Sequence, residues 1–490
     1  MREVDAAARG IALALLLILL VVPPASASQG IIPLHEATRR QLPQGLPWYL
    51  VAFWGDCRPA SISGPSSLIY PRAFVDILNE LDQIRPQVMI GGGDFVSFGT
   101  ESQYAAFYNL TSSHRIENFL PVMGNHEIAY GPQSADFYAK YIGPYNATIV
   151  FDDVPGWRIA ILNSEVTDQN LNLGTSAWIS MLEQAYEGLG NRSLILAFHK
   201  PLYPFVNHQI DPDLGSILDS FLANASVKPA LVLQSHWHGF AINSTNSTVW
   251  LISGGAGAPL YPASDCGPGA TCVSTYNYIL MTLYPNGTYR LYPLKVGSNA
   301  GNLTVSCAGT TCIVNNTKRD VYGNYTDVPV RIAITYGNYT IYVVGIAPAN
   351  STSRVSLDPL NAILSSDLAD FYAYVETAQG AVVFQAAGNA IDLSSIIPRA
   401  TPSTTSASPA TSSPTTSTPT TSMASPTSPA SATSPTTSPA TTPSTATSAP
   451  QSSYAPAPGG PSASVVIAVA VAVAVVAAAL VLALALRRKR

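Results

Sequence analysis

The sequence predicts an α/β fold for residues 48–295, and two observations predict it. Short, continuously apolar segments alternate with segments whose apolar residues recur at helical spacing. Clusters of Asp, Asn and His residues follow directly after five of the apolar segments. Strands that alternate with helices are typical of α/β folds, and open α/β sheets bind their ligands just past the strand ends. The pattern therefore predicts one α/β domain with a functional site at the ends of its strands.

The predicted strands of this domain are apolar runs that end at a turn or a polar residue. They cover residues 48–54, 88–90, 119–123, 158–162, 193–198, 230–234 and 249–252. The predicted helices, whose apolar residues lie on one side, cover residues 71–85, 101–110, 134–141, 175–187 and 211–222. Two further strands, 278–283 and 288–294, flank Pro285-Asn286-Gly287 and predict a hairpin that closes the domain.

The segments after this domain have different compositions. Residues 296–397 are rich in Val, Ile, Thr and Tyr and predict a small β-rich accessory domain, with strands at 328–334 and 339–344 and one helix near 361–371. Residues 398–462 are almost entirely Ser, Thr, Pro and Ala. Such a segment cannot bury a core, so we expect a disordered stalk that is open to O-glycosylation.

Both ends of the chain carry apolar segments. Residues 1–27 combine an apolar run with small residues after Pro23-Pro24, which predicts a signal peptide; an N-terminal anchor is the alternative. A lead-in of residues 28–47 shows no clear period. Residues 463–486 are long and apolar enough for a transmembrane helix, and the basic residues 487–490 predict a cytoplasmic tail. We therefore expect a single-pass cell-surface protein with an extracellular N-terminal ectodomain.

Composition agrees with an exterior location. The net charge of −5, with 11% charged residues, gives no support to nucleic-acid binding.

The cysteines allow two local disulfides, between Cys266 and Cys272 and between Cys307 and Cys312, which are close in sequence. This leaves Cys57 as either a small buried hydrophobe or a redox or ligand residue. Asn-X-Ser/Thr sequons, which accept N-glycans, are frequent. They begin at Asn109, Asn146, Asn191, Asn224, Asn243, Asn246, Asn286, Asn302, Asn315, Asn324, Asn338 and Asn350.

The polar clusters after the strands contain residue types that bind metals. They comprise Asp56, Asp94, Asn125-His126, His199 and His236-Trp237-His238. Such a mixed nitrogen and oxygen set suits divalent Mn, Zn or Fe. Two such ions about 3.5–4 Å apart can bind a phosphate and activate a water molecule. Taken singly, Asp56 and Asp94 are more often turn or helix-cap residues, Asn125 is explained as a turn former, and a lone His199 is more often a core or turn histidine. Their ordered occurrence predicts a metal site.

In this order the clusters resemble the calcineurin-like metallophosphoesterase superfamily, which includes the purple acid phosphatases. The resemblance covers roughly residues 48–295 and extends to Leu173-Gly174 and to the glycine-rich residues 254–257. It implies a two-sheet α/β sandwich flanked by helices, with two divalent metal ions at the strand ends.

The resemblance also implies a role for each site residue. Asp56 and His238 would hold the first metal, and Asp94 would bridge both. Asn125, His199 and His236 would complete the second. His126 would face the phosphate, where it stabilises the transition state or protonates the leaving oxygen. Glu127 is expected to orient neighbouring groups rather than to bind metal.

The sequence departs from the family pattern at the first metal. Many members have His two residues after the first Asp, where this chain has Arg58, and purple acid phosphatases have Tyr where this chain has Ser97. The first metal therefore lacks one protein ligand. Arg58 either binds a phosphate oxygen of the substrate, as a second catalytic residue beside His126, or points away and pairs with a surface acid.

These features predict an extracellular, membrane-anchored, metal-dependent phosphoesterase. It would hydrolyse a phosphate monoester or diester by a metal-activated water, without a covalent intermediate. The alternative is a non-catalytic cell-surface module with a degenerate metal site, which Arg58 and Ser97 favour. An adhesion protein that acts through its β-rich domain is a third hypothesis, although that segment has no ligand-like cluster. His208 is predicted either to line the substrate cleft or to lie on the plain surface.

Overall fold

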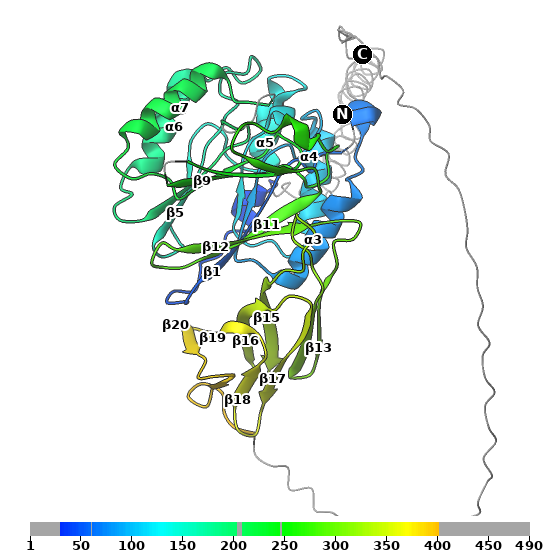
Figure 1. The fold of residues 1–490 in the computed structure, drawn as a ribbon, viewed down its shortest axis with the longest axis vertical. Helices are drawn as coiled ribbons and strands as arrows, with labels where there is room; N and C mark the ends of the chain where they lie inside the picture. Colours follow the sequence, from blue (N-terminus) through cyan, green and yellow to red (C-terminus); the bar gives the residue numbers. More distant parts are fainter. Residues whose placement is uncertain (1–29, 60, 203–207, 246, 401–490) are drawn as a thin grey trace, which may run out of the picture. The chain divides into compact units, whose positions relative to one another are not determined.

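The computed structural model describes residues 30–59, 61–202, 208–245 and 247–400 (Figure 1). The predicted signal peptide, transmembrane helix and basic tail, and nearly all of the predicted stalk, lie outside these ranges. Within them, no helix is both long and apolar enough to cross a membrane.

Two mixed sheets form the α/β domain. The first sheet has the order β12-β11-β1-β2-β3, in which β1, β2 and β3 are parallel. Its strands are β1 (Tyr49–Trp54), β2 (Val88–Gly91), β3 (Phe119–Pro121), β11 (Asn277–Leu283) and β12 (Tyr289–Lys295). The antiparallel pair β11–β12 confirms the predicted hairpin.

The second sheet has seven strands in the order β10-β8-β9-β7-β6-β5-β4, and β5, β6, β7 and β9 are parallel. Its strands are β4 (Ile149–Phe151), β5 (Trp157–Ile161), β6 (Ser193–Ala197), β7 (Leu231–Gln234), β8 (Phe240–Thr245), β9 (Thr248–Ser253) and β10 (Thr271–Val273). The sequence did not predict the edge strands β4 and β10, or β8, which lies beside β10.

Side chains on the two faces of the second sheet pack against two different layers. Ile159, Ile195 and Leu233 belong to one buried cluster with the residues of the first sheet. Leu194 and Leu196 belong to another cluster with α6 (Thr175–Tyr186) and α7 (Pro212–Asn224). Because neighbouring strand residues point to opposite faces, continuous apolar strands can be buried on both sides. The two sheets are therefore packed face to face, with α6 and α7 outside the second (Figure 1).

Helices also cover the outer face of the first sheet. In α3 (Arg72–Ile84) the buried residues Phe74, Ile77, Leu78 and Leu81 recur at helical spacing. Trp54 of β1 contacts Phe74 of α3 and Phe107 of α4 (Glu101–Ser112). The remaining helices include α5 (Gln133–Tyr141) and the short α2 (Leu34–Ala37), which lies in the predicted lead-in. The α/β prediction is thus confirmed.

The β-rich region after residue 295 contains two antiparallel sheets. The five-stranded sheet comprises β13 (Leu303–Ala308), β14 (Thr311–Asn316), β17 (Ser351–Asp358), β18 (Ile363–Ser366) and β21 (Ala390–Asp392). The four-stranded sheet comprises β15 (Val328–Tyr336), β16 (Tyr339–Ala347), β19 (Ala369–Thr377) and β20 (Gly380–Gln385). Buried residues of this region belong to the same cluster as those of the first sheet.

The prediction of a helix near residues 361–371 is wrong. This segment forms β18 and the start of β19. Leu364, Leu368 and Phe371 have helical spacing and are buried, but Leu364 pairs with Leu357 across a strand ladder. Ala362 and Asp370 have φ values of 55° and 47°, which no right-handed helix contains. Strand pairing therefore outweighed the local pattern.

Two local disulfides are present, as predicted. Cys266 is bonded to Cys272, and Cys307 is bonded to Cys312, its opposite neighbour in the β13–β14 hairpin. Cys57 is free and buried. Burial and the nearby carboxylates of Glu127 and Asp56 raise the pKa of the Cys57 thiol, which favours its role as a small packed hydrophobe.

Candidate metal centre

The candidate site lies where strands of both sheets end. Asp56 follows β1, Asp94 follows β2, and Asn125 begins the 3-10 helix η2 (Asn125–Ile128) after β3. His199 follows β6, and His236 follows β7. Since β1 to β3 are parallel, as are β6 and β7, each set of residues lies at one edge of its sheet. This edge is where the sequence predicted the site.

Three of the candidate ligands have left-handed backbone conformations. The φ values are 61° at Asp56, 56° at Asp94 and 68° at His236. This conformation costs a residue other than glycine roughly 1–2 kcal/mol. Such strain persists only where the surroundings enforce it, and it clusters at functional sites. The coincidence at three strand ends indicates turns that direct these side chains into a common centre.

Glycines allow the strand-end loops to approach each other. Gly93 has a φ of 94°, and a Cβ there would lie 2.7 Å from Nδ1 of His199. A Cβ on Gly124 would lie 2.4 Å from Oδ1 of Asp94. Larger residues would therefore displace two candidate ligands, which explains glycine at both places.

The structure brings all six predicted metal ligands together. Ligand atoms of Asp94, His199 and His236 lie within 4.8 Å of one another, and so do those of Asp56, Asp94 and His238. Oδ1 of Asn125 lies 3.2 Å from Nε2 of His199, which places it beside the first of these groups. Asp94 belongs to both groups, as a bridging carboxylate would.

Backbone carbonyls determine which nitrogen each histidine presents. Nδ1 of His199 lies 2.8 Å from the carbonyl oxygen of Gly92, and Nδ1 of His238 lies 2.6 Å from that of Pro259. A carbonyl only accepts hydrogen bonds, so each Nδ1 donates and each Nε2 carries a lone pair. This is the arrangement by which second-shell groups orient metal-binding histidines.

Two carboxylate oxygens at the centre have no hydrogen-bond donor among the described residues. They are Oδ1 of Asp56 and Oδ2 of Asp94, and both are buried. The other oxygen of each accepts from a backbone N–H, of His236 at 2.8 Å and of His126 at 3.1 Å. Nε2 of His238 lies 3.4 Å from Oδ1 of Asp56, so a lone pair faces an anion. A buried anion without a partner is costly, and a cation would satisfy both atoms. The donors therefore fit divalent metal ions.

The electrostatics of the centre couple these groups. Burial opposes ionisation of Asp94, but His126, His199, His236 and Arg58 lower its pKa overall. Burial favours neutral His199, whereas Asp94 and Asp56 raise its pKa above the ordinary value. Burial and neighbouring His199 hold the pKa of His236 well below its usual range.

Glu127 connects the loop after β2 to the loop after β3. Its Oε2 accepts from the N–H groups of Asp94 at 2.8 Å and Gly124 at 2.6 Å. Its Oε1 accepts from those of Phe95 at 2.7 Å and Val96 at 3.2 Å. Burial and the charge of Asp94 raise the pKa of Glu127 to about 8. The carboxyl group thus positions the backbone on both sides of Asp94, as the sequence suggested.

His126 lies at the accessible side of the centre. Its side chain is 26% exposed, and its Nδ1 donates to the carbonyl oxygen of Ser97 at 2.7 Å. Nε2, the remaining nitrogen, lies 3.8 Å from Oδ2 of Asp94. The imidazole is therefore held by one nitrogen and presents the other beside the candidate metal ligands.

Arg58 turns toward the centre, so the hypothesis that it pairs with a surface acid is wrong. Its side chain is 9% exposed, and Nε lies 3.7 Å from Oδ2 of Asp94. Nε and Nη1 are buried and have no hydrogen-bond partner among the described residues. The hydroxyl of Ser97, at the position of the family tyrosine, donates to the carbonyl of Pro59.

Two aromatic residues lie beside the centre, and the sequence did not predict a role for one of them, Tyr261. The ring of Tyr261 stacks on His238, with centroids 4.3 Å apart and planes 6° apart. His208 stacks on the same tyrosine at 4.3 Å and lies 5.5 Å from His236. His208 therefore lies beside the centre, the first of its two predicted locations. Only the Pro-Leu-Tyr-Pro sequence around Tyr261 marks it, and this carries no chemical signal.

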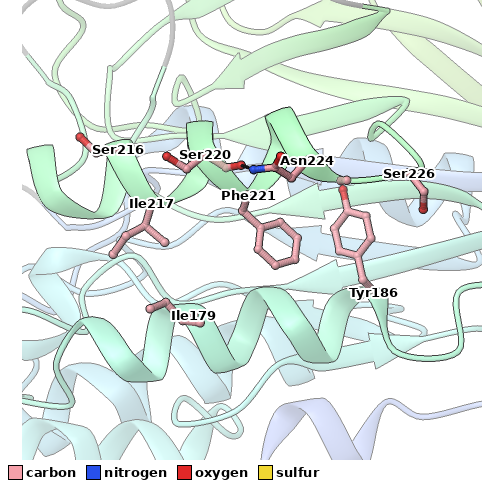
Figure 2. Close-up of a pocket in the computed structure, with 9 residues that line it drawn as sticks. Ile179, Tyr186, Ser216, Ile217, Ser220, Phe221, Asn224 and Ser226 are labelled. Atoms are coloured by element: carbon pink, nitrogen blue, oxygen red, sulfur yellow. Dashed lines mark hydrogen bonds between the residues drawn. The ribbon is translucent and has the colours of Figure 1, made fainter.

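A separate apolar groove lies between α6 and α7. Figure 2 shows Ile217 and Phe221 of α7 pointing toward Ile179 and Tyr186 of α6. None of the predicted site residues lines this groove. Its lining contains no Asp, Glu, His, Lys, Arg or Cys, so it offers no acid, base or metal-binding cluster like the one at the strand ends.

Comparison with known families agrees with this geometry. Residues 51–240 match the family model described as Calcineurin-like phosphoesterase. This part of the chain is therefore a calcineurin-like phosphoesterase domain, which confirms the resemblance stated above for these residues. No curated protein matches the chain.

Similar solved structures come from several organisms. One is described as GAP50, the anchor in the inner membrane complex of Plasmodium, with 15% identity, a TM-score of 0.40, and coverage of 51% of this chain and 85% of that one. A dimetal phosphatase from Danio rerio has 13% identity and a TM-score of 0.36, and the match covers 51% of this chain and 97% of that one. A putative 5'-nucleotidase from Staphylococcus aureus has 12% identity, a TM-score of 0.32, and coverage of 50% and 54%.

Proposed function

We propose that this chain is a metal-dependent phosphoesterase that hydrolyses phosphate monoesters or diesters. The observation that carries the proposal is the pair of donor groups that share Asp94 and include buried carboxylate oxygens without a donor among the described residues. Asp56, Asp94 and His238 would hold one ion, and Asp94, Asn125, His199 and His236 the other. Divalent ions there would supply Lewis-acid activation of the phosphoryl group and of water.

The chain's own residues would bind the substrate and move a proton. Arg58 has two buried nitrogens without partners among the described residues, and they can donate to phosphate oxygens. His126 is fixed through Nδ1, which leaves Nε2 to protonate the leaving oxygen. Asp94 and the turns around it are held by Glu127, so the donors would not have to reorganise when substrate binds.

A non-catalytic surface module with a degenerate metal site is the second candidate. The observation that favours it is the cationic side chain of Arg58, 3.7 Å from the carboxylate that both donor groups share. Among the Asp, Glu, His and Cys residues that the structure describes, the donor group of Asp56, Asp94 and His238 also has just three members. Under this hypothesis, the chain would bind metal weakly and would hydrolyse no phosphoester.

We also propose that the enzyme acts at the cell surface, anchored by the apolar segment at residues 463–486. Two disulfides support an oxidising location. Of the eleven sequon asparagines that the structure describes, ten are exposed and Asn243 is half-buried. Among the described residues, the four buried asparagines, Asn118, Asn163, Asn277 and Asn316, all lie outside sequons. The sequons are thus accessible to N-glycosylation.

Hydrolysis of 4-nitrophenyl phosphate and bis(4-nitrophenyl) phosphate tests the proposed activity. The chain would be assayed with added Mn, Zn or Fe beside Asp94→Ala and a control, Asp76→Ala, in which the changed aspartate lies on α3 and pairs only with exposed Arg72. We expect hydrolysis by the wild type and the control and none by Asp94→Ala. Equal rates in all three would reject the site, and absence of hydrolysis in all would favour the non-catalytic module.

A further inference from the structure

Arg58 supplies a fixed positive charge to the candidate metal centre. Its side chain is almost fully buried, and Nε lies 3.7 Å from Oδ2 of Asp94. Nε and Nη1 have no hydrogen-bond partner among the described residues, and Oδ2 of Asp94 has none either. The guanidinium therefore lies beside the shared carboxylate without forming a closed, hydrogen-bonded ion pair with it.

The two donor groups differ in number of ligands and in charge. Asp94, His199 and His236 are joined by the amide oxygen of Asn125, which makes four protein donors. Asp56, Asp94 and His238 make three, and the Ser97 hydroxyl is engaged with the carbonyl of Pro59. The smaller number of ligands does not by itself disfavour an ion at the second group, because catalytic ions keep an open coordination position. The larger difference between the two positions comes from the charge of Arg58.

The two donor groups contain two carboxylates, Asp56 and Asp94, and Arg58 offsets one of their two negative charges. One divalent ion already makes the centre net positive. A second ion would then enter against both the first ion and the guanidinium, in a buried site where repulsion between charges is weakly screened. A phosphate group would reverse this balance, since it brings negative charge and accepts hydrogen bonds from Arg58.

We propose that Arg58 makes the two metal positions unequal and makes occupancy of the second depend on bound phosphate. One divalent ion binds tightly at Asp94, Asn125, His199 and His236. The position at Asp56, Asp94 and His238 binds a second ion weakly until a phosphate group lies against Arg58. The inference rests on the proposed function, because it assigns the order in which that centre is filled.

Titration of the metal-free chain with Mn²⁺, followed by calorimetry and by metal analysis after dialysis, tests this order without any measurement of activity. For the wild type we expect one tightly bound ion per chain and a second, weaker one. Inorganic phosphate should tighten the second ion. Without phosphate, Arg58→Gln should bind the second ion at least about tenfold more tightly than the wild type does. Added phosphate should then no longer tighten the second ion.

Two further variants separate charge from packing. Arg58→Lys retains the charge and should behave as the wild type, whereas Arg72→Gln removes an exposed arginine of α3 and should change neither ion. If Arg58→Gln is misfolded by circular dichroism, Arg58→Lys and the phosphate dependence of the wild type still decide the question. Two equally tight ions in the wild type, unaffected by phosphate, would overturn this inference and leave the proposed function intact. No bound ion under any condition would instead reject the proposed function.

Discussion

Oδ1 of Asp94 lies 3.3 Å from Nε2 of His199, although Asp94 follows a strand of the first sheet and His199 follows a strand of the second. Neither sheet alone contains the candidate metal centre. The shared buried cluster between the sheets sets the separation of these two side chains. The packing of the two sheets against each other therefore sets the geometry of the site.

Glu127→Gln should weaken both the fold and the metal centre. Each carboxylate oxygen of Glu127 accepts hydrogen bonds from two backbone N–H groups. Glutamine would place its NH2 group, which is a donor, against two of these N–H donors. We expect a loss of about 1–3 kcal/mol in the free energy of unfolding, measured with urea. Metal affinity should fall roughly 10–100-fold. Glu101→Gln, at an exposed carboxylate paired with Lys140, is the control and should change stability by less than about 1 kcal/mol. Equal effects of the two substitutions would contradict the positioning role.

His126→Gln should lower kcat without removing metal. Its imidazole is held by the carbonyl of Ser97 and belongs to neither donor group. Loss of general acid catalysis typically lowers the rate about 10²–10⁴-fold. The loss should be smaller with 4-nitrophenyl phosphate, whose leaving group needs little protonation, than with an alkyl phosphate. The same loss with both substrates would indicate that His126 does not protonate the leaving oxygen.

Lys318→Met should destabilise the contact between α3 and the β-rich region. The side chain of Lys318 is 0% exposed, and Nζ donates to both oxygens of Glu80 and to the carbonyl of Lys295. Removal of one partner from a buried ion pair costs about 3–5 kcal/mol, and the partial exposure of Glu80 places the expected loss near the lower end. Arg290→Met, at an exposed pair with Asp370, should cost less than about 1 kcal/mol in the same urea titration. Similar midpoints for both variants would show that the buried pair contributes little.

Glycopeptide mass spectrometry of the chain from its native cells tests the proposed exterior location. Occupied sites are expected among the exposed sequons, for example Asn191, Asn286 and Asn338. Thr288→Ala, which removes the sequon of Asn286, should abolish modification at that asparagine alone. A chain without modification at any sequon would count against the proposed location, but it would not affect the metal centre.

Much of the site could be predicted from the sequence because its residues directly follow apolar strands. Parallel strands end at the same edge of a sheet, so Asp56 and Asp94 of the first sheet are expected to lie close together, as are His199 and His236 of the second. Only the packing between the sheets brings the two sets together. The direction of the Arg58 side chain could not be predicted. Arg58 lies two residues after the left-handed Asp56, where a side chain can point inward or outward depending on its neighbours. Tyr261 and His208 reach the centre from loops, which have no periodic pattern to locate them.

The β-rich region shows the limit of local patterns. Residues 361–371 combine helical spacing with buried apolar side chains, yet they lie in strands because β17 and β16 offer partners for them. The edge strands β4 and β10 are short and depend on their neighbours in the sheet in the same way. Pairing with neighbouring strands in the sheets therefore decided these elements.

We propose that Asp94 is shared by metal ions that activate phosphoester hydrolysis. The most direct test is the rate of 4-nitrophenyl phosphate hydrolysis before and after removal of metal with a chelator, with metal content measured in parallel. We predict that activity is lost with the metal and returns when Mn, Zn or Fe is restored, and that Asp94→Asn neither retains the metal nor recovers activity. Hydrolysis that persists in the metal-free wild type, or in Asp94→Asn, would contradict the account.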